Sequence, residues 1–359
     1  MEQLFSPVQL GNLKLKNRIA LAPMTRVSAA EDGSVTERMI RYYLRFVQGG
    51  FGLIITEGTY IDESRSQGYL YQPGLTSREH IESWRRLTEA VHHGGARIFS
   101  QIMHAGALSQ GNRFTAVSVA PSAVQPKGEQ LAMYRGAGAY RLPREITGAE
   151  IQEVIGSFAA AAVHAREAGF DGVEIHGANG YILDEFLTDY TNRRTDEYGG
   201  STENRVRLSA EVVQRIREAV GPEYPVGIRI SQAKVNDYEH KWQDGESDAE
   251  IIFSRLAQAG ADFIHVTEYD AALPAFGTGS SLAALAKKYG RVPVIANGNL
   301  EDPLKADALL AKGEADLVSL GKGALANRDW PNRALQGEPI RPFTPEIFQP
   351  YADIKDEEL

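Results

Sequence analysis

Cysteine is the most informative absence in this 359-residue chain, because the sequence contains none. Disulfides, iron–sulfur clusters held by thiolates and cysteine nucleophiles are therefore excluded, and the composition fits the reducing environment of the cytoplasm. Long apolar runs are absent too, since no stretch approaches the roughly 18 residues of a membrane span. The first residues, Met1–Phe5, lack the basic and apolar regions of a signal peptide. We therefore expect a cytoplasmic protein without a membrane partner.

Clusters of positive charge are also lacking. The chain has 38 Lys and Arg against 47 Asp and Glu, a formal net charge of -9, and its basic residues are dispersed. A nucleic-acid partner is therefore not expected. The acidic end, Asp356–Leu359, is predicted to be a solvated tail. The chain does have material for a large core, because 43% of its residues are hydrophobic.

Eight short runs of β-branched and aliphatic residues recur along the chain and are apolar almost throughout, as strands buried on both faces are. They span residues 18–23, 51–56, 96–101, 171–176, 226–230, 261–266, 292–297 and 315–320. Helical patterns lie between them, for example over 81–93, 149–168, 205–220, 248–259 and 303–311. Eight β-then-α units predict an α/β fold, a (β/α)8 TIM barrel, formed by residues 1–359 as a single domain.

Two segments fall outside this repeat. Residues 8–16 alternate in polarity and turn at Gly11-Asn12, which predicts an N-terminal β-hairpin that caps the barrel. Residues 103–147 form a long loop after the third strand, rich in Gly, Ala and Ser. Loops of this length in compact domains are usually functional or disordered, and we interpret this one as a lid over the site.

The polar residues that follow the fourth strand carry the chemistry. Catalytic groups of a TIM barrel lie at the C-terminal ends of its strands. Here His176, Asn179 and Tyr181 offer an imidazole, a carboxamide and a phenol within six residues. The first two can hold an oxygen that becomes negative, and the third can give a proton. This equipment suits the addition of hydrogen across a polarised double bond.

Anion-binding features lie at other strand ends. Arg229 stands within the fifth run, where a buried guanidinium needs either a carboxylate partner or an anionic ligand. Gly-rich turns follow the seventh and eighth runs, at 297–299 and 320–323, and include Lys322. With a short helix expected near 327–335, they predict a phosphate site. These residues alone leave open whether the phosphate belongs to a substrate or a cofactor.

Together these motifs resemble the Old Yellow Enzyme family of FMN-dependent ene-reductases. The matching segments run in family order over nearly the whole chain, at 17–19, 22–26, 56–59, 101–106, 173–181, 192–201, 227–231, 297–299 and 320–322. The resemblance implies bound FMN. Thr25 would meet the O4 and N5 edge of the flavin, Gln101 its pyrimidine edge, and Arg229 its N1 and O2 atoms. It further implies wall contacts from Pro23, Met24 and Gly58, and a phosphate site made by Gly298, Asn299, Gly321 and Lys322.

The resemblance also implies how a substrate is handled. NADPH or NADH would reduce the flavin, whose N5 would deliver hydride to Cβ of an α,β-unsaturated carbonyl compound or another electron-poor alkene. His176 and Asn179 would bind the carbonyl oxygen, and Tyr181 would protonate Cα. Tyr69 and Tyr269 would help to bind the substrate. The expected partner is thus a small molecule, and the expected assembly is a monomer or homodimer.

Departures from the family pattern limit what carries over. Lys322 stands where many members have Arg, which implies a point charge instead of a bidentate phosphate contact. Ala107 replaces a frequent Arg. Thr25, in place of the Cys of one branch, and Asn179, in place of His, put the chain nearer the classical branch.

Rival readings have weaker support. A dienoyl-CoA reductase would need an iron–sulfur cluster, which the absence of Cys excludes. A Schiff-base lyase or aldolase would need a Lys at the end of the sixth strand, and none is present. A glycosidase would need paired carboxylates such as Glu57 and Glu268 across the barrel mouth. A metal hydrolase would need clustered ligands. A non-enzymatic flavin carrier is disfavoured by the intact trio of His176, Asn179 and Tyr181.

Overall fold

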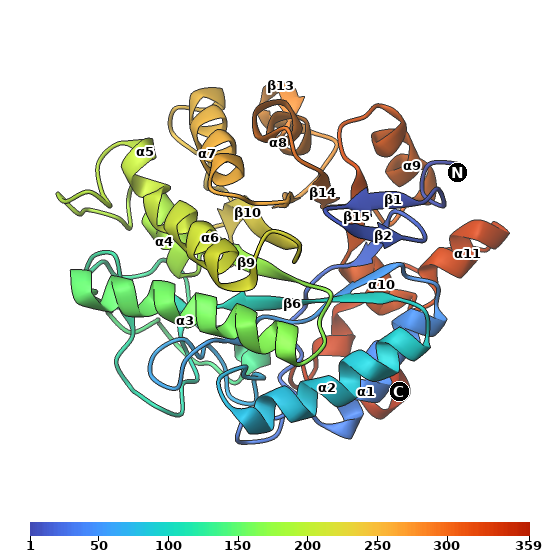
Figure 1. Cartoon of the computed structure of the whole chain (residues 1–359), viewed down its shortest axis with the longest axis horizontal. Helices are drawn as coiled ribbons and strands as arrows, with labels where there is room; N and C mark the ends of the chain where they lie inside the picture. The colour runs from blue at the N-terminus through green and yellow to red at the C-terminus, as the bar shows by residue number, and fades with distance from the viewer.

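A closed barrel of eight parallel strands forms the centre of the computed structural model, which describes all residues 1–359 (Figure 1). The strands are β3 (Ile19–Leu21), β4 (Leu53–Ile55), β6 (Arg97–Met103), β9 (Gly172–Asn179), β10 (Val226–Lys234), β11 (Phe263–Thr267), β14 (Val294–Asn297) and β15 (Leu317–Leu320). Pairing of β4 with β6 completes the circle, and a short strand β5 (Thr59–Tyr60) adds to β6. The predicted TIM barrel is therefore confirmed.

Helices surround the strands (Figure 1). They are α1 (Glu37–Gln48), α2 (Arg78–His93), α3 (Gly148–Glu167), α4 (Ile182–Leu187), α5 (Thr202–Arg205), α6 (Arg207–Val220), α7 (Glu246–Gln258), α8 (Leu282–Gly290), α9 (Pro303–Ala311), α10 (Lys322–Ala326) and α11 (Trp330–Gln336). Side-chain caps fix several starts, such as the capping box of Thr147 and Glu150 on α3. The sequence patterns did not single out α1 and α8. The short helix expected near 327–335 is α11, and the shorter helix α10, which was not expected, precedes it.

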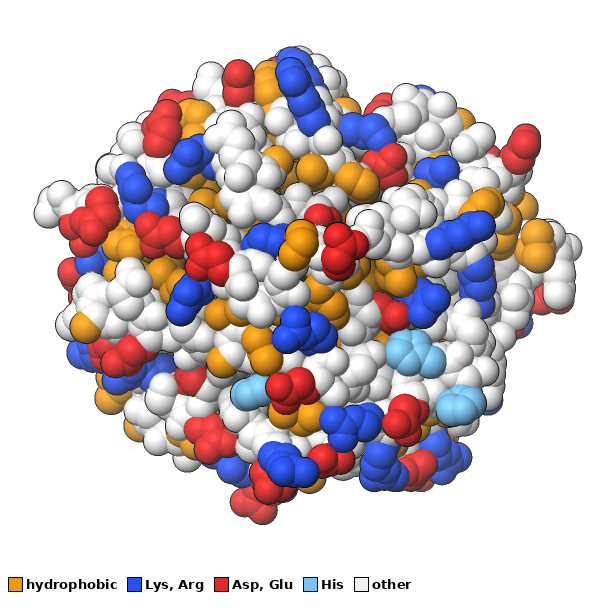
Figure 2. All heavy atoms as spheres, viewed as in Figure 1, with side chains coloured by type: hydrophobic (Ala, Val, Ile, Leu, Met, Phe, Trp, Pro, Cys, Tyr) orange, Lys and Arg blue, Asp and Glu red, His pale blue; other side chains and the backbone are white.

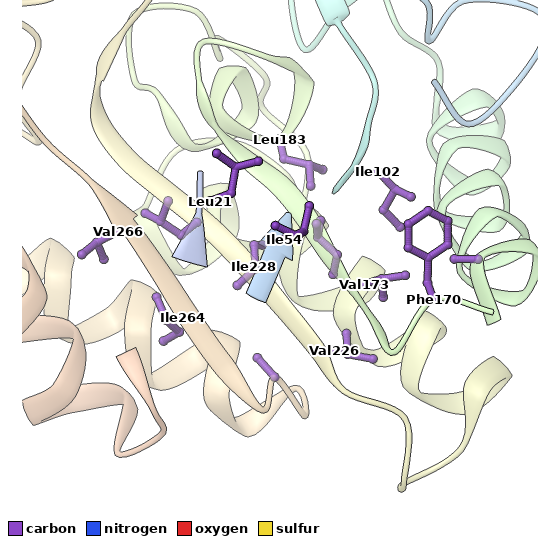
Figure 3. Close-up of a cluster of buried hydrophobic side chains, with 14 of the residues drawn as sticks. Leu21, Ile54, Ile102, Phe170, Val173, Leu183, Val226, Ile228, Ile264 and Val266 are labelled. Atoms are coloured by element: carbon purple, nitrogen blue, oxygen red, sulfur yellow. The ribbon is translucent and has the colours of Figure 1, made fainter. Parts of the chain in front are cut away.

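The main core fills the space between the strands and the helices. Side chains of alternate strand positions, such as Ile228, Ile264 and Val266, point outward into this layer (Figure 3). Their neighbours along the strand therefore point into the barrel. This alternation places Phe263, His265 and Thr267 inside the barrel on β11.

The layer of side chains at the N-terminal end of the barrel interior is apolar. The predicted hairpin covers this layer. Strands β1 (Val8–Leu10) and β2 (Leu13–Leu15) pair antiparallel around Gly11-Asn12. Leu10 and Leu15 of this hairpin pack on inward-facing side chains that include Phe99 and Phe263. The hairpin therefore seals the N-terminal end of the barrel, as the sequence predicted, and leaves the opposite end for a site.

The long segment after β6 contains only short elements. These are η1 (Gly106–Leu108), β7 (Val119–Ala120), η2 (Ala132–Tyr134) and β8 (Arg144–Glu145). Strand β7 pairs with β8, so the segment leaves and re-enters near one point. A second excursion, the hairpin of β12 (Pro274–Phe276) and β13 (Thr278–Ser281), follows β11.

The C-terminal segment corrects one expectation, because it is anchored and not a solvated tail. It contains η3 (Pro345–Phe348) and η4 (Asp356–Glu358), and the C-terminus lies beside α1 (Figure 1). The carboxylate of Glu358 is buried and accepts two hydrogen bonds from the buried guanidinium of Arg26, at 2.6 and 2.5 Å. Ala352 N donates to Met133 O at 2.8 Å. The tail thus ties the end of β3 to the segment after β6.

The surface shown in Figure 2 carries acidic and basic side chains interspersed, without a large region of one sign. None of the helices combines the length and apolar composition that a membrane crossing requires.

Candidate active site

A cavity of about 640 Å³ opens at the C-terminal ends of the barrel strands. The C-terminal halves of seven of the eight barrel strands, all except β4, or the turns that follow them, contribute to it. The predicted site residues on its surface are Pro23, Met24, Thr25, Gln101, His176, Asn179, Tyr181, Arg229, Tyr269, Gly298, Asn299, Gly321 and Lys322. The fold therefore gathers most of the predicted constellation into one space.

Gly58 and Tyr69 are the predicted residues that do not line this cavity. The carbonyl oxygen of Gly58 accepts a hydrogen bond from Gln72 Nε2 at 2.7 Å. A Cβ at position 58 would stand 2.1 Å from Met103 Sδ, so a side chain there would displace that of Met103. Tyr69 is buried behind Tyr181 and packs in the same cluster as Met103.

The His176 ring is placed to donate a hydrogen bond into the cavity. Its Nδ1 accepts from Ala178 N at 3.4 Å, which leaves the proton of the neutral ring on Nε2. Burial, with the nearby charge of Arg229, holds the pKa of His176 well below its ordinary value. The imidazole is therefore neutral at neutral pH and offers one N–H.

Asn179 and Tyr181 flank that donor. Asn179 adopts a left-handed backbone conformation (φ 64°), which Asn tolerates better than most residues, and its backbone N–H donates to Ser231 Oγ at 2.9 Å. Its side-chain amide makes no hydrogen bond within the chain. The ring of Tyr181 meets the ring of His176 edge-on, with centroids 4.8 Å apart. The three predicted groups therefore line the same cavity.

Tyr181 has one hydrogen-bond partner, the phenol of Tyr69, with 2.6 Å between the two oxygens. Burial raises the pKa of Tyr181 to about 12, and the hydrogen bond from Tyr69 opposes that rise. Tyr181 is therefore protonated at neutral pH. A bond from Tyr69 leaves the Tyr181 proton free to point into the cavity.

Arg229 has no carboxylate partner. Its side chain is 6% exposed, one terminal nitrogen donates to Asn297 Oδ1 at 3.1 Å, and its Nε has no partner. Thr267 Oγ1 also donates to Asn297 Oδ1, at 2.7 Å, and Asn297 Nδ2 donates to Ser319 O. Asn297 precedes the predicted Gly298, but no local pattern indicates its contact with Arg229. A buried salt bridge does not account for Arg229, so an anionic or electron-rich ligand is the better match.

Two further polar groups on the cavity surface lack partners in the chain. Gln101 Nε2 donates to Glu174 Oε1 at 2.8 Å, which leaves Gln101 Oε1 free. The hydroxyl of Thr25 also makes no hydrogen bond. A flat heterocycle with ring nitrogens and carbonyl oxygens would satisfy both groups together with Arg229.

The turns after β14 and β15 form the other end of the cavity. Gly298 has φ 135°, and a Cβ there would stand 2.2 Å from Glu268 O, so only glycine fits. Gly321 caps α10, whose first N–H groups have no helical partner. Lys322 is exposed and pairs with no carboxylate. Asn299 differs, because its side chain donates to Asp270 at 2.7 Å and only its backbone is free for a ligand.

Comparison with known proteins identifies the family. The model of the NADH:flavin oxidoreductase / NADH oxidase family matches residues 3–340. The chain belongs to this family.

Two curated relatives illustrate the range of the family. An NADH oxidase of Thermoanaerobacter brockii is 38% identical over 345 residues, which cover 93% of this chain and 51% of that protein. A probable flavin mononucleotide-dependent alkene reductase of Leishmania infantum is 36% identical over 362 residues, covering 97% and 94%. The chain thus spans about half the length of the first relative but nearly all of the second.

Among solved structures, an Old Yellow Enzyme homologue from Zymomonas mobilis superposes with a TM-score of 0.85 at 34% identity, covering 98% of this chain and 99% of that one. Morphinone reductase in complex with tetrahydroNAD gives a TM-score of 0.83 at 33% identity, covering 96% and 93%. The predicted membership of the Old Yellow Enzyme group of flavin oxidoreductases is confirmed. The comparisons do not separate its branches, so the placement nearer the classical branch stays a prediction.

Several residues that line the cavity of this protein were not predicted from the sequence. They are Leu131, Met133, Ala233, Val235, Tyr238, Thr267, Glu301, Ser319 and Phe348. Leu131, Met133 and Tyr134 come from the long segment after β6, which we interpret as a lid, and line the cavity. Phe348 comes from the anchored tail, which no local pattern places there. Tyr269 is 88% exposed, so it stands at the rim.

Proposed function

We propose that this protein holds FMN in the cavity and reduces the C=C bond of α,β-unsaturated carbonyl compounds and other electron-poor alkenes with NAD(P)H. The observation that carries the proposal is the combination of His176 Nε2–H, the Asn179 amide and the Tyr181 hydroxyl on one cavity that also contains the unpaired Arg229 guanidinium. Two hydrogen-bond donors and an acid face the same space. That arrangement matches polarisation of a carbonyl and protonation of the carbon beside it.

FMN fits the polar groups that the chain leaves unpartnered. Thr25, Gln101 and Arg229 would hold the edges of the isoalloxazine ring, and Pro23 and Met24 would provide its wall. The backbone of residues 298–299 and 321–323, with Lys322, would hold the phosphate. When bound, FMN supplies the hydride chemistry by accepting from a nicotinamide and giving to Cβ of the alkene. Arg229 would stabilise the negative charge that reduction adds near N1 and O2.

His176 and Asn179 would bind the carbonyl oxygen of the alkene. Because His176 is neutral, it polarises that oxygen by hydrogen bonding and gives up no proton. As the enolate forms, both donors stabilise its negative oxygen, as an oxyanion hole does. The oxygen is thereby fixed beside Tyr181.

Tyr181 would protonate Cα. Its raised pKa keeps the proton in place until carbanion character develops on the substrate. Tyr69 would then donate to the phenolate oxygen that remains. This places Tyr69 behind the acid, where it positions Tyr181 without touching the substrate.

The wider proposal treats residues 1–359 as a single FMN-binding domain that works as a monomer or homodimer in the cytoplasm, with NADPH or NADH as reductant. The Leishmania relative described as an alkene reductase and the morphinone reductase complex with tetrahydroNAD support it. The glycosidase alternative has no support, because Glu57 is buried away from the cavity.

Product analysis tests the function. Purified protein saturated with FMN is given NADPH or NADH and 2-cyclohexenone, and the products are separated by gas chromatography. We expect cyclohexanone, since reduction is directed to C=C. Formation of 2-cyclohexenol, or oxidation of NAD(P)H only by oxygen with the enone untouched, would overturn the proposal.

A further inference from the structure

A layer of four polar side chains crosses the barrel between its apolar base and the cavity. Gln101, Glu174, His265 and Ser319 come from four strands, and none is more than 2% exposed. Glu174 Oε1 accepts from Gln101 Nε2 at 2.8 Å, and Glu174 Oε2 lies 2.7 Å from His265 Nδ1. His265 Nε2 lies 2.8 Å from Ser319 Oγ. The function proposed above uses Gln101 but assigns nothing to Glu174 or His265.

The donors and acceptors in this layer can be assigned. A carboxylate only accepts, so His265 Nδ1–H donates to Glu174, and His265 Nε2 accepts from the hydroxyl of Ser319. Burial lowers the pKa of His265, so the ring is neutral at neutral pH. His265 therefore orients Glu174 without neutralising it. No Lys or Arg nitrogen lies within 4.0 Å of the Glu174 carboxylate.

Arg229 carries the positive charge opposite in sign to Glu174, and it lies one layer of side chains closer to the cavity. On neighbouring strands Arg229 is opposite His176, and Glu174 stands two residues before His176 on β9. Two residues of a strand span roughly 7 Å, so the carboxylate lies below the layer of Arg229 and His176. The positive charge that faces the cavity is thus backed by a buried negative charge that does not touch it.

We propose that Glu174 lowers the reduction potential of the flavin that this site holds. The inference rests on the proposed function, since it requires FMN beside Arg229. Two electrons and one proton enter the ring when the nicotinamide is oxidised, so the site gains one negative charge. Arg229 stabilises that charge and Glu174 opposes it. At roughly 10 Å and an effective dielectric constant of about 20, one unit charge changes an equilibrium constant on the order of tenfold.

The consequence is a stronger electron donor. Glu174 makes the equilibrium of the alkene half-reaction about tenfold more favourable and that of flavin reduction by the nicotinamide about tenfold less favourable, while the overall equilibrium between nicotinamide and alkene is unchanged. Glu174 is therefore a positioning and tuning residue, acting through charge and through the Gln101 amide. It contacts neither the alkene nor the nicotinamide.

The test is the midpoint potential of the FMN-loaded protein, measured anaerobically against a reference dye. Glu174→Gln keeps the shape and removes the charge, and we expect its flavin to be reduced with an equilibrium constant about tenfold larger, a positive shift of about 30 mV for two electrons. Glu174→Asp keeps the charge, so its potential stays near that of the parent protein. Where Glu174→Gln does not fold, Glu174→Ser, which leaves room for water, takes its place with the same expected shift.

Asp248→Asn is the matched control. Asp248 is a buried carboxylate on α7 that accepts from Asp244 N at 2.9 Å and does not line the cavity, so its replacement leaves the potential unchanged. An unchanged potential in Glu174→Gln, or equal shifts in Glu174→Gln and Glu174→Asp, would overturn the inference while FMN reduction by NADPH or NADH still supported the proposed function. Failure of the parent protein to hold FMN would instead count against that function.

Discussion

The hydroxyl oxygens of Tyr69 and Tyr181 lie 2.6 Å apart, and neither phenol has another hydrogen-bond partner in the chain. Only Tyr181 lines the cavity. Burial holds the pKa of Tyr69 well above its ordinary value, so this inner phenol keeps its proton. The pair therefore has a direction, with Tyr69 donating to Tyr181 and Tyr181 presenting its proton to the cavity.

Replacing the acid separates the two half-reactions. Tyr181→Phe is expected to slow reoxidation of the flavin by 2-cyclohexenone by roughly 10²- to 10⁴-fold, the usual contribution of a general acid. Reduction by NADPH needs no proton from the protein and stays within about twofold of the parent rate. Stopped-flow absorbance measures both steps, and an equal loss in both would make Tyr181 structural.

Removing only the inner phenol has a smaller effect of the same kind. Tyr69→Phe is expected to slow enone reduction roughly tenfold, because the phenolate left on Tyr181 loses a charge-assisted hydrogen bond. The solvent deuterium isotope effect on this step increases. Tyr140→Phe is the control, since Tyr140 packs in the same cluster but bonds neither phenol. If both variants behave alike, packing and not hydrogen bonding is responsible.

The oxyanion donors are tested by phenol binding. A phenolate bound over FMN produces a long-wavelength charge-transfer band, and its oxygen would occupy the position of the enone oxygen. The double variant His176→Ala with Asn179→Ala is expected to lose that band and to slow enone reduction by at least 10²-fold. Persistence of the band at the parent affinity would contradict the assignment of both residues.

Stability should depend on pH through Glu57. Burial raises the pKa of this carboxyl from 4.5 to about 7. Below about pH 4.5 the carboxyl is protonated in both the folded and the unfolded state, so the free energy of unfolding is not reduced. Between about pH 4.5 and pH 7 only the unfolded state releases the proton, so the free energy of unfolding falls. The loss is roughly 3 kcal/mol. Urea unfolding at pH 5 and pH 8 should show a pH dependence smaller by most of this amount in Glu57→Gln, because a small part is already lost at pH 5, and an unchanged dependence would show that Glu57 does not titrate there.

The anchored tail should contribute to stability as well. Glu358→Gln leaves the buried Arg26 without its main counter-charge, and breaking such a pair costs about 3 kcal/mol or more. We expect a lower thermal midpoint. Because the tail also binds Met133 of the cavity mouth, the KM for the enone should rise more than kcat falls. Arg38 and Asp356 form an exposed pair, so Asp356→Asn serves as a control with little effect.

Local patterns were sufficient for the barrel and much of the site. The strands are recognisable in the sequence as apolar runs because both of their faces are buried. The C-terminal ends of the strands lie together in any TIM barrel, so residues at these ends are expected to form one site. The sequence alone therefore predicts that His176, Asn179, Tyr181 and Arg229 share one cavity.

Contacts between distant segments could not be predicted in the same way. The link of Glu174 to His265 joins residues 91 positions apart and depends on strand register. The place of Tyr69 behind Tyr181 depends on packing of the loop after β5. The acidic sequence of the tail predicted that it is exposed to solvent. Instead, Glu358 accepts a hydrogen bond from Arg26, which lies 332 positions away in the sequence.

The most direct test is an anaerobic visible spectrum followed in one cuvette. Protein carrying FMN is recorded first, then after one equivalent of NADPH or NADH, and then after 2-cyclohexenone. We expect a flavin spectrum that bleaches with the nicotinamide and returns with the enone. A protein that stays colourless when FMN is added, or a bleached flavin that the enone does not restore, would contradict it.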